Sequence, residues 1–480
     1  MLKRSLILVM AAWLGFFAAS SAAKTITVKQ DGTGDTTTVQ AALNAASDGD
    51  IIEIADDGRY VEDLSASPVL AQAGLAPALF SFTLRAAAGK HPVVEAANAE
   101  TSQRMSILEL PGRDMLGFAI WGCNGVTIQG IEFAALENSV NAFNVQSCIT
   151  IADSANVTIE DCIVRGPGEP SPGEGTGILI AGVAANPFLT DNITIRNCSI
   201  IDPHYGITSA IFMKGSGTDA NHVTIEDCQF SNTTESAVDI DNAHEAVVRR
   251  CTMSDCKYGI HFAGGNSIVE DCLVFYSLSE GLKADVDENW NDQIVGAVVR
   301  RCAFIGNGVQ NPEAGVRCAD GASIRFENCI IAGNGGPGLR VQTGSTTDVN
   351  VILDRCDLYE NSGESEVIVE GNGMNLATLT ITNSNIVSSF DGIVNEIEFE
   401  AVTLHHNNVF VPGELYNYVG SSDSVSVDPM YVSPTIIPEE FAFGDFALQG
   451  GSPVLTAGEG GTAIGSQGPL ETQVKDWSVY

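Results

Sequence analysis

The chain has 480 residues, of which 60 are Asp or Glu and 23 are Lys or Arg, so its formal net charge at pH 7 is −37. We expect no binding to nucleic acid or to an anionic membrane, because a phosphate-binding protein needs a basic face. A hydrophobic content of 44% with only 17% charged residues excludes a disordered chain.

The chain begins with the features of an export signal. Lys3 and Arg4 precede an apolar run, and small residues at 21–23 provide a cleavage site. The run is too short for a stable membrane span, so residues 1–23 are predicted to be a secretory signal peptide. A retained anchor is the alternative. We therefore expect a secreted, periplasmic or cell-surface protein, with no membrane insertion after signal removal.

A short motif of the form apolar-x-apolar-x-x-Cys-x-apolar recurs through the middle of the chain. Its cysteines are Cys162, Cys198, Cys228, Cys251, Cys272, Cys302, Cys329 and Cys356. The same frame has another residue in place of Cys at Ile131, Ser384 and Asn407. Variable spacing around a constant motif, in at least eleven repeats, predicts a solenoid.

Each repeat is predicted to consist of strands. Apolar and polar residues alternate in short β-branched runs that are bounded by Gly, Asn and Asp. This pattern predicts an all-β parallel β-helix with two or three strands per coil. Thr38–Ala46 is the best helical candidate and lies where the first coil needs a cap. We expect a cap and first coils over 24–130, central repeats over 131–411, and a closing segment and tail over 412–480.

The cysteines of the motif are expected to form an inward-facing column, because equivalent residues of neighbouring coils stack about 4.8 Å apart. Twelve cysteines in an exported chain would normally indicate disulfides. Because Ile, Ser and Asn occupy the same position in other repeats, free buried thiols are favoured over bridges. The pairing of the other four stays open; these are Cys123, Cys148, Cys256 and Cys318.

The chain resembles the right-handed parallel β-helix superfamily, to which pectate lyases and other polysaccharide-processing enzymes belong. Asp31–Leu64 resembles the opening of that group, in which a short helix caps the first coil, and Thr83–Asn98 resembles its first full coil. Gly444–Pro469 resembles the closing segment of many exported bacterial proteins of this type. The resemblance implies a right-handed coil, but the superfamily includes lyases, hydrolases, epimerases, esterases and non-catalytic surface proteins.

A second strand follows each Cys, with the pattern Gly/Ala-apolar-x-apolar. Its apolar residues point inward, so x points outward. The outward column is Leu179, then Thr208 or Phe212, then Asp239, His261, Lys283, Arg317, Arg340, Ile368 and Val394. Three adjacent cations in so acidic a chain mark this column as the candidate functional site.

The column is predicted to bind an acidic polysaccharide. The guanidinium forks of Arg317 and Arg340 suit sugar carboxylates. Lys283 is the candidate base for the proton next to a carboxylate, and His261 is the competing base because it needs no perturbation near neutral pH. The catalytic candidates are thus Lys283, His261 and Arg317, and the substrate-binding candidates are Arg340, Asp239 and Trp290.

Calcium is the candidate cofactor. Asp241, Asp285 and Asp287 carry the oxygen ligands that Ca²⁺ prefers, and polysaccharide lyases of the resembled fold often combine a Lys or Arg base with calcium. The acidic loop 285–292 also carries Trp290, which is suited to stacking on a sugar ring. A solvated acidic loop is the alternative interpretation, since the spacing of an EF-hand is absent.

Three functions remain open. Lyase- or epimerase-type proton abstraction on a uronic-acid polymer is favoured. A non-catalytic surface, adhesive or glycan-binding β-helix needs only the solenoid, with its cations neutralised by nearby acids. A glycoside hydrolase needs two carboxylates, which Asp239 supplies together with Asp241 or Asp285. In each case the partner is a polysaccharide, and we expect a monomer.

Overall fold

The structure is a computed structural model. It describes residues 23–66, 79–96, 117–134, 146–165, 175–183, 190–201, 207–216, 220–241, 243–263, 265–285, 294–344, 347–371, 376–396, 401–412, 416–417, 421–436 and 444–466. The predicted signal peptide lies outside these ranges except for Ala23.

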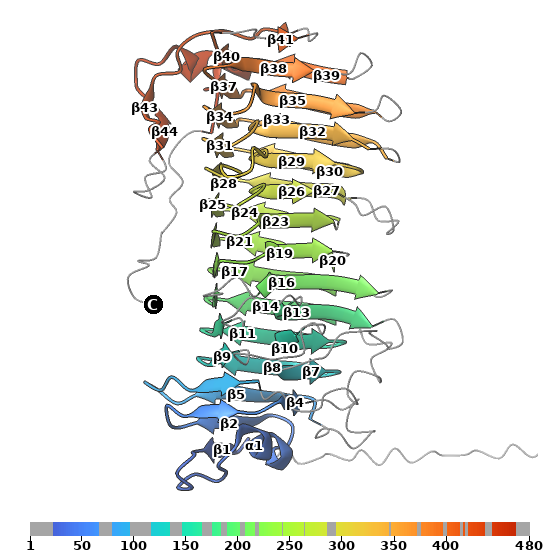
Figure 1. Cartoon of the computed structure of the whole chain (residues 1–480), viewed down its shortest axis with the longest axis vertical. Coiled ribbons are helices and arrows are strands. Elements are labelled where there is room, and N and C mark those ends of the chain that lie inside the picture. Colours follow the sequence, from blue (N-terminus) through green and yellow to red (C-terminus); the bar gives the residue numbers. More distant parts are fainter. Residues whose placement is uncertain are drawn as a thin grey trace, which may run out of the picture.

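Three parallel sheets run along one stack of coils (Figure 1). Sheet A has 16 strands within the described residues. They are β1 (Thr25–Val28), β2 (Asp50–Ile54), β5 (Phe82–Ala86), β8 (Asn124–Gln129), β11 (Ala155–Glu160), β14 (Thr190–Arg196), β17 (Ala220–Glu226), β21 (Val247–Arg249), β24 (Ile268–Glu270), β27 (Ile294–Arg300), β30 (Ala322–Glu327), β33 (Val349–Asp354), β36 (Ala377–Thr382), β39 (Ala401–His405) and β42 (Ser421–Ser422), with β20 (Ala243–His244) paired to β17.

Sheet B follows sheet A in each coil. Its 13 described strands are β3 (Arg59–Val61), β6 (Val93–Glu95), β9 (Glu132–Ala134), β12 (Ile163–Arg165), β15 (Ser199–Ile201), β18 (Gln229–Ser231), β22 (Thr252–Ser254), β25 (Leu273–Phe275), β28 (Ala303–Ile305), β31 (Ile330–Ala332), β34 (Asp357–Tyr359), β37 (Asn385–Val387) and β40 (Asn408–Phe410).

Sheet C completes each coil. Its 13 described strands are β4 (Leu64–Ala66), β7 (Phe118–Trp121), β10 (Gln146–Ala152), β13 (Gly175–Val183), β16 (Ile207–Ser216), β19 (Ser236–Asp241), β23 (Tyr258–Ala263), β26 (Leu282–Ala284), β29 (Val316–Ala319), β32 (Leu339–Thr343), β35 (Ser365–Gly371), β38 (Asp391–Asn395) and β41 (Tyr416–Asn417). The predicted parallel β-helix is confirmed, with three strands per coil.

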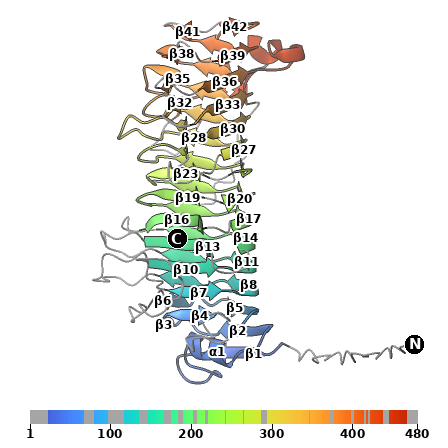
Figure 2. The ribbon, with the colours of Figure 1, turned by 90° about the vertical axis from the view of Figure 1, so that its right-hand side faces the viewer.

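One short helix, α1 (Val39–Ala45), lies at the N-terminal end of the stack (Figures 1 and 2). The Thr38 hydroxyl accepts a hydrogen bond from the backbone N–H of Ala41, which satisfies one of the free donors of the first turn. Leu43 and its apolar neighbours are buried against the first coil. The predicted capping helix is therefore confirmed.

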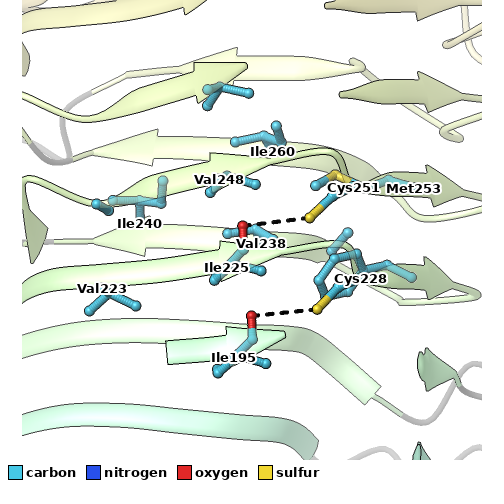
Figure 3. Close-up of a cluster of buried hydrophobic side chains, with 14 of the residues drawn as sticks. Ile195, Val223, Ile225, Cys228, Val238, Ile240, Val248, Cys251, Met253 and Ile260 are labelled. Carbon is cyan, nitrogen blue, oxygen red and sulfur yellow. Dashed lines mark hydrogen bonds between the residues drawn. The ribbon is translucent and has the colours of Figure 1, made fainter. Parts of the chain in front are cut away.

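The predicted cysteine column lies inside the coil. Figure 3 shows Cys228 and Cys251, whose thiols each lie 3.7 Å from a carbonyl of the preceding coil, that of Ile195 and Ile225 respectively. All twelve cysteines are buried, and each is a thiol rather than part of a disulfide. The residue before each column position turns the chain in the left-handed region, as Asp227 does with φ of 54°. The column is therefore a stack of thiols that fills the corner between sheets A and B.

The chain beyond the last coil folds back along the outside of sheet B. Strands β43 (Tyr431–Ser433) and β44 (Asp445–Leu448) form an antiparallel pair, which lies beside sheet B in Figure 1. Tyr431 and Phe446 belong to a second apolar cluster together with Phe275 and Ile305 of sheet B. Two short 3₁₀ turns follow, η2 (Pro453–Thr456) and η3 (Glu459–Gly461). Across the described part of the chain, no helix has the length and apolarity needed to cross a bilayer.

Candidate functional site

The outward column of sheet C has the predicted register. Asp239 pairs with His261, His261 with Lys283, Lys283 with Arg317, and Arg317 with Arg340. The column continues through Ile368 and Val394. The position left open between Leu179 and Asp239 belongs to Phe212, because Phe212 pairs with both. Strand pairing alone therefore brings the five polar residues onto adjacent strands.

Exposure distinguishes two parts of this column. Its N-terminal positions Ser65, Ala119 and Thr150 are buried although they point away from the coil interior. From Asp239 to Arg340, between 15% and 25% of each side chain is exposed. Half-buried polar side chains can contact a ligand while the fold restrains their orientation. The accessible polar face thus begins at β19.

Four groups at the start of this face form one connected cluster. His261 lies between two carboxylates, with Nδ1 3.0 Å from Asp239 Oδ1 and Nε2 2.8 Å from Asp285 Oδ1. The second oxygen of Asp285 lies 2.8 Å from Lys283 Nζ. Asp285 follows β26 directly, so the same strand supplies the lysine and its partner. The cluster orients a basic nitrogen and an imidazole toward one face.

Electrostatics fix the charge of this cluster. Burial disfavours the imidazolium, but the carboxylates of Asp239 and Asp285 outweigh it and raise the pKa of His261 to about 10. Burial by itself would raise the pKa of Asp285, yet the hydrogen bond from His261 and the charge of Lys283 bring it well below its usual value. His261 is therefore protonated at neutral pH. In this state it is suited to donating a proton, whereas its predicted role as the competing base requires the neutral imidazole.

The two arginines contact carboxylates loosely. Arg317 donates to the neutral amide oxygen of Gln342 at 2.8 Å, and its Nη1 is 4.0 Å from Glu280 and 3.9 Å from Asp285. Arg340 is 3.4 Å from Glu313 and 3.6 Å from Glu370. These guanidinium groups are oriented by neighbours without being held in a tight carboxylate pair.

Arginines elsewhere in the coil are paired more tightly. On sheet A, Arg249 is 2.6 Å from Glu226, and Arg300 is 2.6 Å from Glu270. Arg301, in the adjoining turn, is 2.7 Å from Asp271. Charge-assisted hydrogen bonds of this length satisfy both partners. The sheet A pairs therefore have a structural role, which separates them from the cations of sheet C.

Several side chains that lie beside the column were not predicted from the strand pattern. Glu280 and Glu313 lie in the turns that precede β26 and β29 and approach the arginines from the side. The ring of Tyr258 lies 5.4 Å from Lys283 Nζ. Glu370 sits two positions beyond Ile368 on the same strand. A signal for the first two is present in the sequence, because Glu280 and Glu313 stand one and two residues before the Gly that precedes a site strand.

One of the three predicted calcium ligands, Asp285, already has other partners. Both oxygens of Asp285 already face cations, so this carboxylate as placed does not fit a calcium ion. Asp287 and Trp290 lie outside the described residues, and the side chain of Asp241 does too. Within the described ranges, no group of three or more His, Cys, Asp or Glu residues is arranged to hold a metal. The role of these residues stays a prediction.

Comparisons with known proteins identify the fold. The chain matches a family model described as a right handed beta helix region over residues 176–356. No curated protein sequence matches it. It is similar to the catalytic unit of an α-1,3-glucanase from Streptomyces thermodiastaticus, with 13% identity, coverage of 84% of this chain and 71% of that chain, and a TM-score of 0.56. It is also similar to XylC solved with xylose, with 11% identity, coverage of 85% and 87%, and a TM-score of 0.50.

The chain is also similar to a tailspike protein, but it covers a smaller share of that protein than of the two above. The enzymatically active domain of bacteriophage CBA120 tailspike protein 2 has 11% identity and a TM-score of 0.37, with coverage of 67% of this chain and 43% of that chain. The chain thus spans less than half of that domain. At such identities the likeness is one of fold. The chain is a right-handed parallel β-helix protein, as its repeats predict.

Proposed function

We propose that the outer face of sheet C from β19 to β32 binds an acidic polysaccharide and abstracts a proton next to a sugar carboxylate, as a lyase or an epimerase does. The observation that carries the proposal is the loose pairing of Arg317 and Arg340, at 3.4 to 4.0 Å from carboxylates. By contrast, the arginines at 249, 300 and 301 on and beside sheet A lie 2.6 to 2.7 Å from theirs. A ligand carboxylate can take the close position that protein acids leave unfilled.

The proposed chemistry assigns one role to each group of the cluster. Arg317 neutralises the substrate carboxylate, which acidifies the adjacent C–H bond. Lys283, one strand spacing of about 4.8 Å away, is the proposed base that takes that proton. Asp285 holds Lys283 in place with one oxygen and His261 with the other.

The two reaction types differ in what happens next. In β-elimination a C=C bond forms, the neighbouring C–O bond breaks, and His261 donates its proton to the departing sugar oxygen. In epimerisation a second group donates a proton to the opposite face of the same carbon, and the imidazolium of His261 is the donor that the cluster offers. Both begin with the same abstraction, so the cluster supports either.

Hydrolysis is less well supported by this cluster. It requires one protonated carboxyl and one carboxylate. Asp239 and Asp285 lie on opposite nitrogens of His261, but the lowered pKa of Asp285 keeps that group ionised. In a hydrolase Asp285 is therefore suited to the role of the carboxylate and not to that of the acid.

The test is a screen of the exported protein against pectate, alginate and glycosaminoglycans. Cleavage is followed by the absorbance of an unsaturated product, and epimerisation by the uronic-acid composition of the polymer. Each assay is run with EGTA and with added calcium, which also tests the calcium prediction. We expect Lys283→Ala and Arg317→Ala to abolish turnover.

Two matched controls accompany these variants. Lys257→Ala removes a lysine that is paired with Glu235 at 2.7 Å, and Arg249→Ala removes an arginine of sheet A. Both controls should keep wild-type activity. Binding without turnover by the wild-type protein would refute catalysis and leave a glycan-binding β-helix, whereas failure to bind any of the three polymer classes would refute the proposal as a whole.

A further inference from the structure

Three buried asparagines are stacked in the turns that lead from sheet B into sheet C. Asn307 Nδ2 donates to Asn334 Oδ1 at 3.1 Å, and Asn334 Nδ2 donates to Asn361 Oδ1 at 2.7 Å. Asn334 Oδ1 also accepts the backbone N–H of Asn307 at 2.8 Å, and Asn361 Oδ1 accepts the backbone N–H of Asn334 at 3.0 Å. Each Nδ2 also donates to a carbonyl of the preceding coil, that of Val274, Phe304 or Ile331. Each amide thus joins successive coils on both sides.

A carboxyl group ends this amide ladder. Asn361 donates its backbone N–H to Glu366 Oε1 at 2.9 Å and its side-chain Nδ2 to Oε2 at 2.5 Å. Glu366 has no exposed surface. Glu360 is the charged group that faces it among the described residues, and the side chain of Ser388 also contacts it. Glu366 therefore occupies the acceptor position that a fourth asparagine would fill.

The ladder lies directly beneath the strands that carry the cations. A Cβ atom added to Gly281 would lie 2.7 Å from Asn307 Nδ2, one added to Gly338 would lie 2.7 Å from Asn361 Nδ2, and Gly315 is closer still to Asn334. Each glycine stands two residues before a cation of the column. The corresponding sets are Gly281, Asn307 and Lys283; Gly315, Asn334 and Arg317; and Gly338, Asn361 and Arg340.

We propose that the amide ladder and the Glu366 carboxyl are positioning residues for the cation column, and that loss of the Glu366 proton weakens this support. The ladder fixes the strand ends from which Lys283, Arg317 and Arg340 project. Arg340 is the cation nearest to the Glu366 end, so it is affected most and Lys283 least. The consequence for ligand binding rests on the proposed function, whereas the consequence for local stability does not.

The direction of the pH effect follows from burial. Burial disfavours the carboxylate and, against the hydrogen bonds from Asn361, raises the pKa of Glu366 to about 8. The proton therefore stabilises the folded state fully below about pH 4.5, and this contribution is lost as the pH rises to about 8. A local opening that exposes Glu366 should become roughly tenfold easier per pH unit inside that window.

Hydrogen exchange tests the positioning role without any ligand. After correction for the intrinsic rate, amides of β32 and β35 should exchange up to roughly a hundredfold faster at pH 8 than at pH 6. Amides of β23 should change little. In Glu366→Gln this pH dependence should disappear, whereas Glu364→Gln, the same charge change at an exposed site, should behave as wild type.

Calorimetric binding of a galacturonate oligomer at pH 6.5 and pH 9 tests the effect on the site. Wild-type affinity should fall by about tenfold at pH 9, and that of Glu366→Gln should not. The proposal is overturned if exchange depends on pH equally in wild type and in Glu366→Gln. It is also overturned if the exchange of β23 changes with pH as much as that of β32 and β35. If Glu366→Gln fails to fold, the exchange rates of β32 and β35 can still be compared with those of β23 in the wild type, and that comparison tests the proposal. If the oligomer never binds while hydrogen exchange behaves as expected, galacturonate is excluded as the ligand and the positioning role stands.

Discussion

Oδ1 of Asp285 lies 2.8 Å from Nε2 of His261, while Oδ2 of the same carboxylate faces Lys283. One acid thus binds two cations that lie on neighbouring strands. The arrangement explains why the two candidate bases cannot be treated as independent groups. A change at Asp285 therefore removes a contact from both cations at once.

His261 should contribute a pH-dependent share of stability. Its pKa rises from an ordinary value of about 6.5 to about 10, so the stabilisation is complete below pH 6.5 and is lost as the pH rises through about 10. Thermal unfolding of wild type and His261→Gln should therefore differ most at pH 6 and converge above pH 10. His222→Gln is the matched control, since His222 also bridges two acids but is 60% exposed and should matter little. A pH-independent difference for His261→Gln would contradict this account.

Gly315 should not tolerate a side chain. A Cβ atom there would collide with the amide of Asn334, so Gly315→Ala should destabilise the protein by about 1–3 kcal/mol in urea unfolding. Gly450→Ala is the control, because nothing lies within 4 Å of a Cβ at that position. Asn334→Ala alone should also destabilise, since it leaves the Phe304 carbonyl without its donor. The double variant should cost less than the sum of the two. Strict additivity would show that the two residues are not in contact.

The cysteine thiols should be unreactive in the native protein. Burial raises the pKa of Cys123 to about 12 and that of Cys256 to about 11, and the other ten cysteines are buried as well. We expect no labelling by a maleimide under native conditions and twelve labelled thiols in denaturant without a reducing agent. Fewer than twelve in denaturant would reveal disulfides and contradict the free-thiol column.

Tyr431 should hold the C-terminal segment on sheet B. Its hydroxyl donates to the buried carboxyl of Asp357 at 2.6 Å, and the backbone N–H of Ser466 donates to the same group at 2.7 Å. Tyr431→Phe removes one donor from a buried acid at a cost of about 1–3 kcal/mol. Limited proteolysis should then cut near β43 and β44 sooner than in wild type. Tyr258→Phe is the comparison, and equal cutting of both variants would speak against this role.

Repeats in the sequence predict most of the fold. The position that Cys228 shares with Ile131 and Ser384 sets the frame of every coil, and strict alternation then gives the outward direction of Lys283. Such periodicity is a local property, so it can be read without coordinates. The choice between Thr208 and Phe212 needed strand pairing, because an irregular register between β13 and β16 hides it.

The parts that the sequence did not predict depend on turns and on charge. Asn307, Asn334 and Asn361 each follow a column cysteine by five residues, so their signal was present but lay outside the strand pattern. The protonation of His261 depends on two carboxylates from different coils, which periodicity does not place. The return of β43 and β44 onto sheet B is a long-range contact, and no repeat encodes it.

The packing of β43 and β44 on sheet B affects how the protein unfolds. In a solenoid each coil contacts its neighbours, so unfolding can begin at an end and proceed one coil at a time. Here Ser466 bonds to Asp357 across 109 residues, and Ile464 accepts from Asn385 across 79. The closing segment is thereby fastened to β34 and β37, the two sheet B strands that precede β40. Fraying from the C-terminal end must first release this tie, so we expect unfolding from that end to be slow and the stack to resist proteolysis.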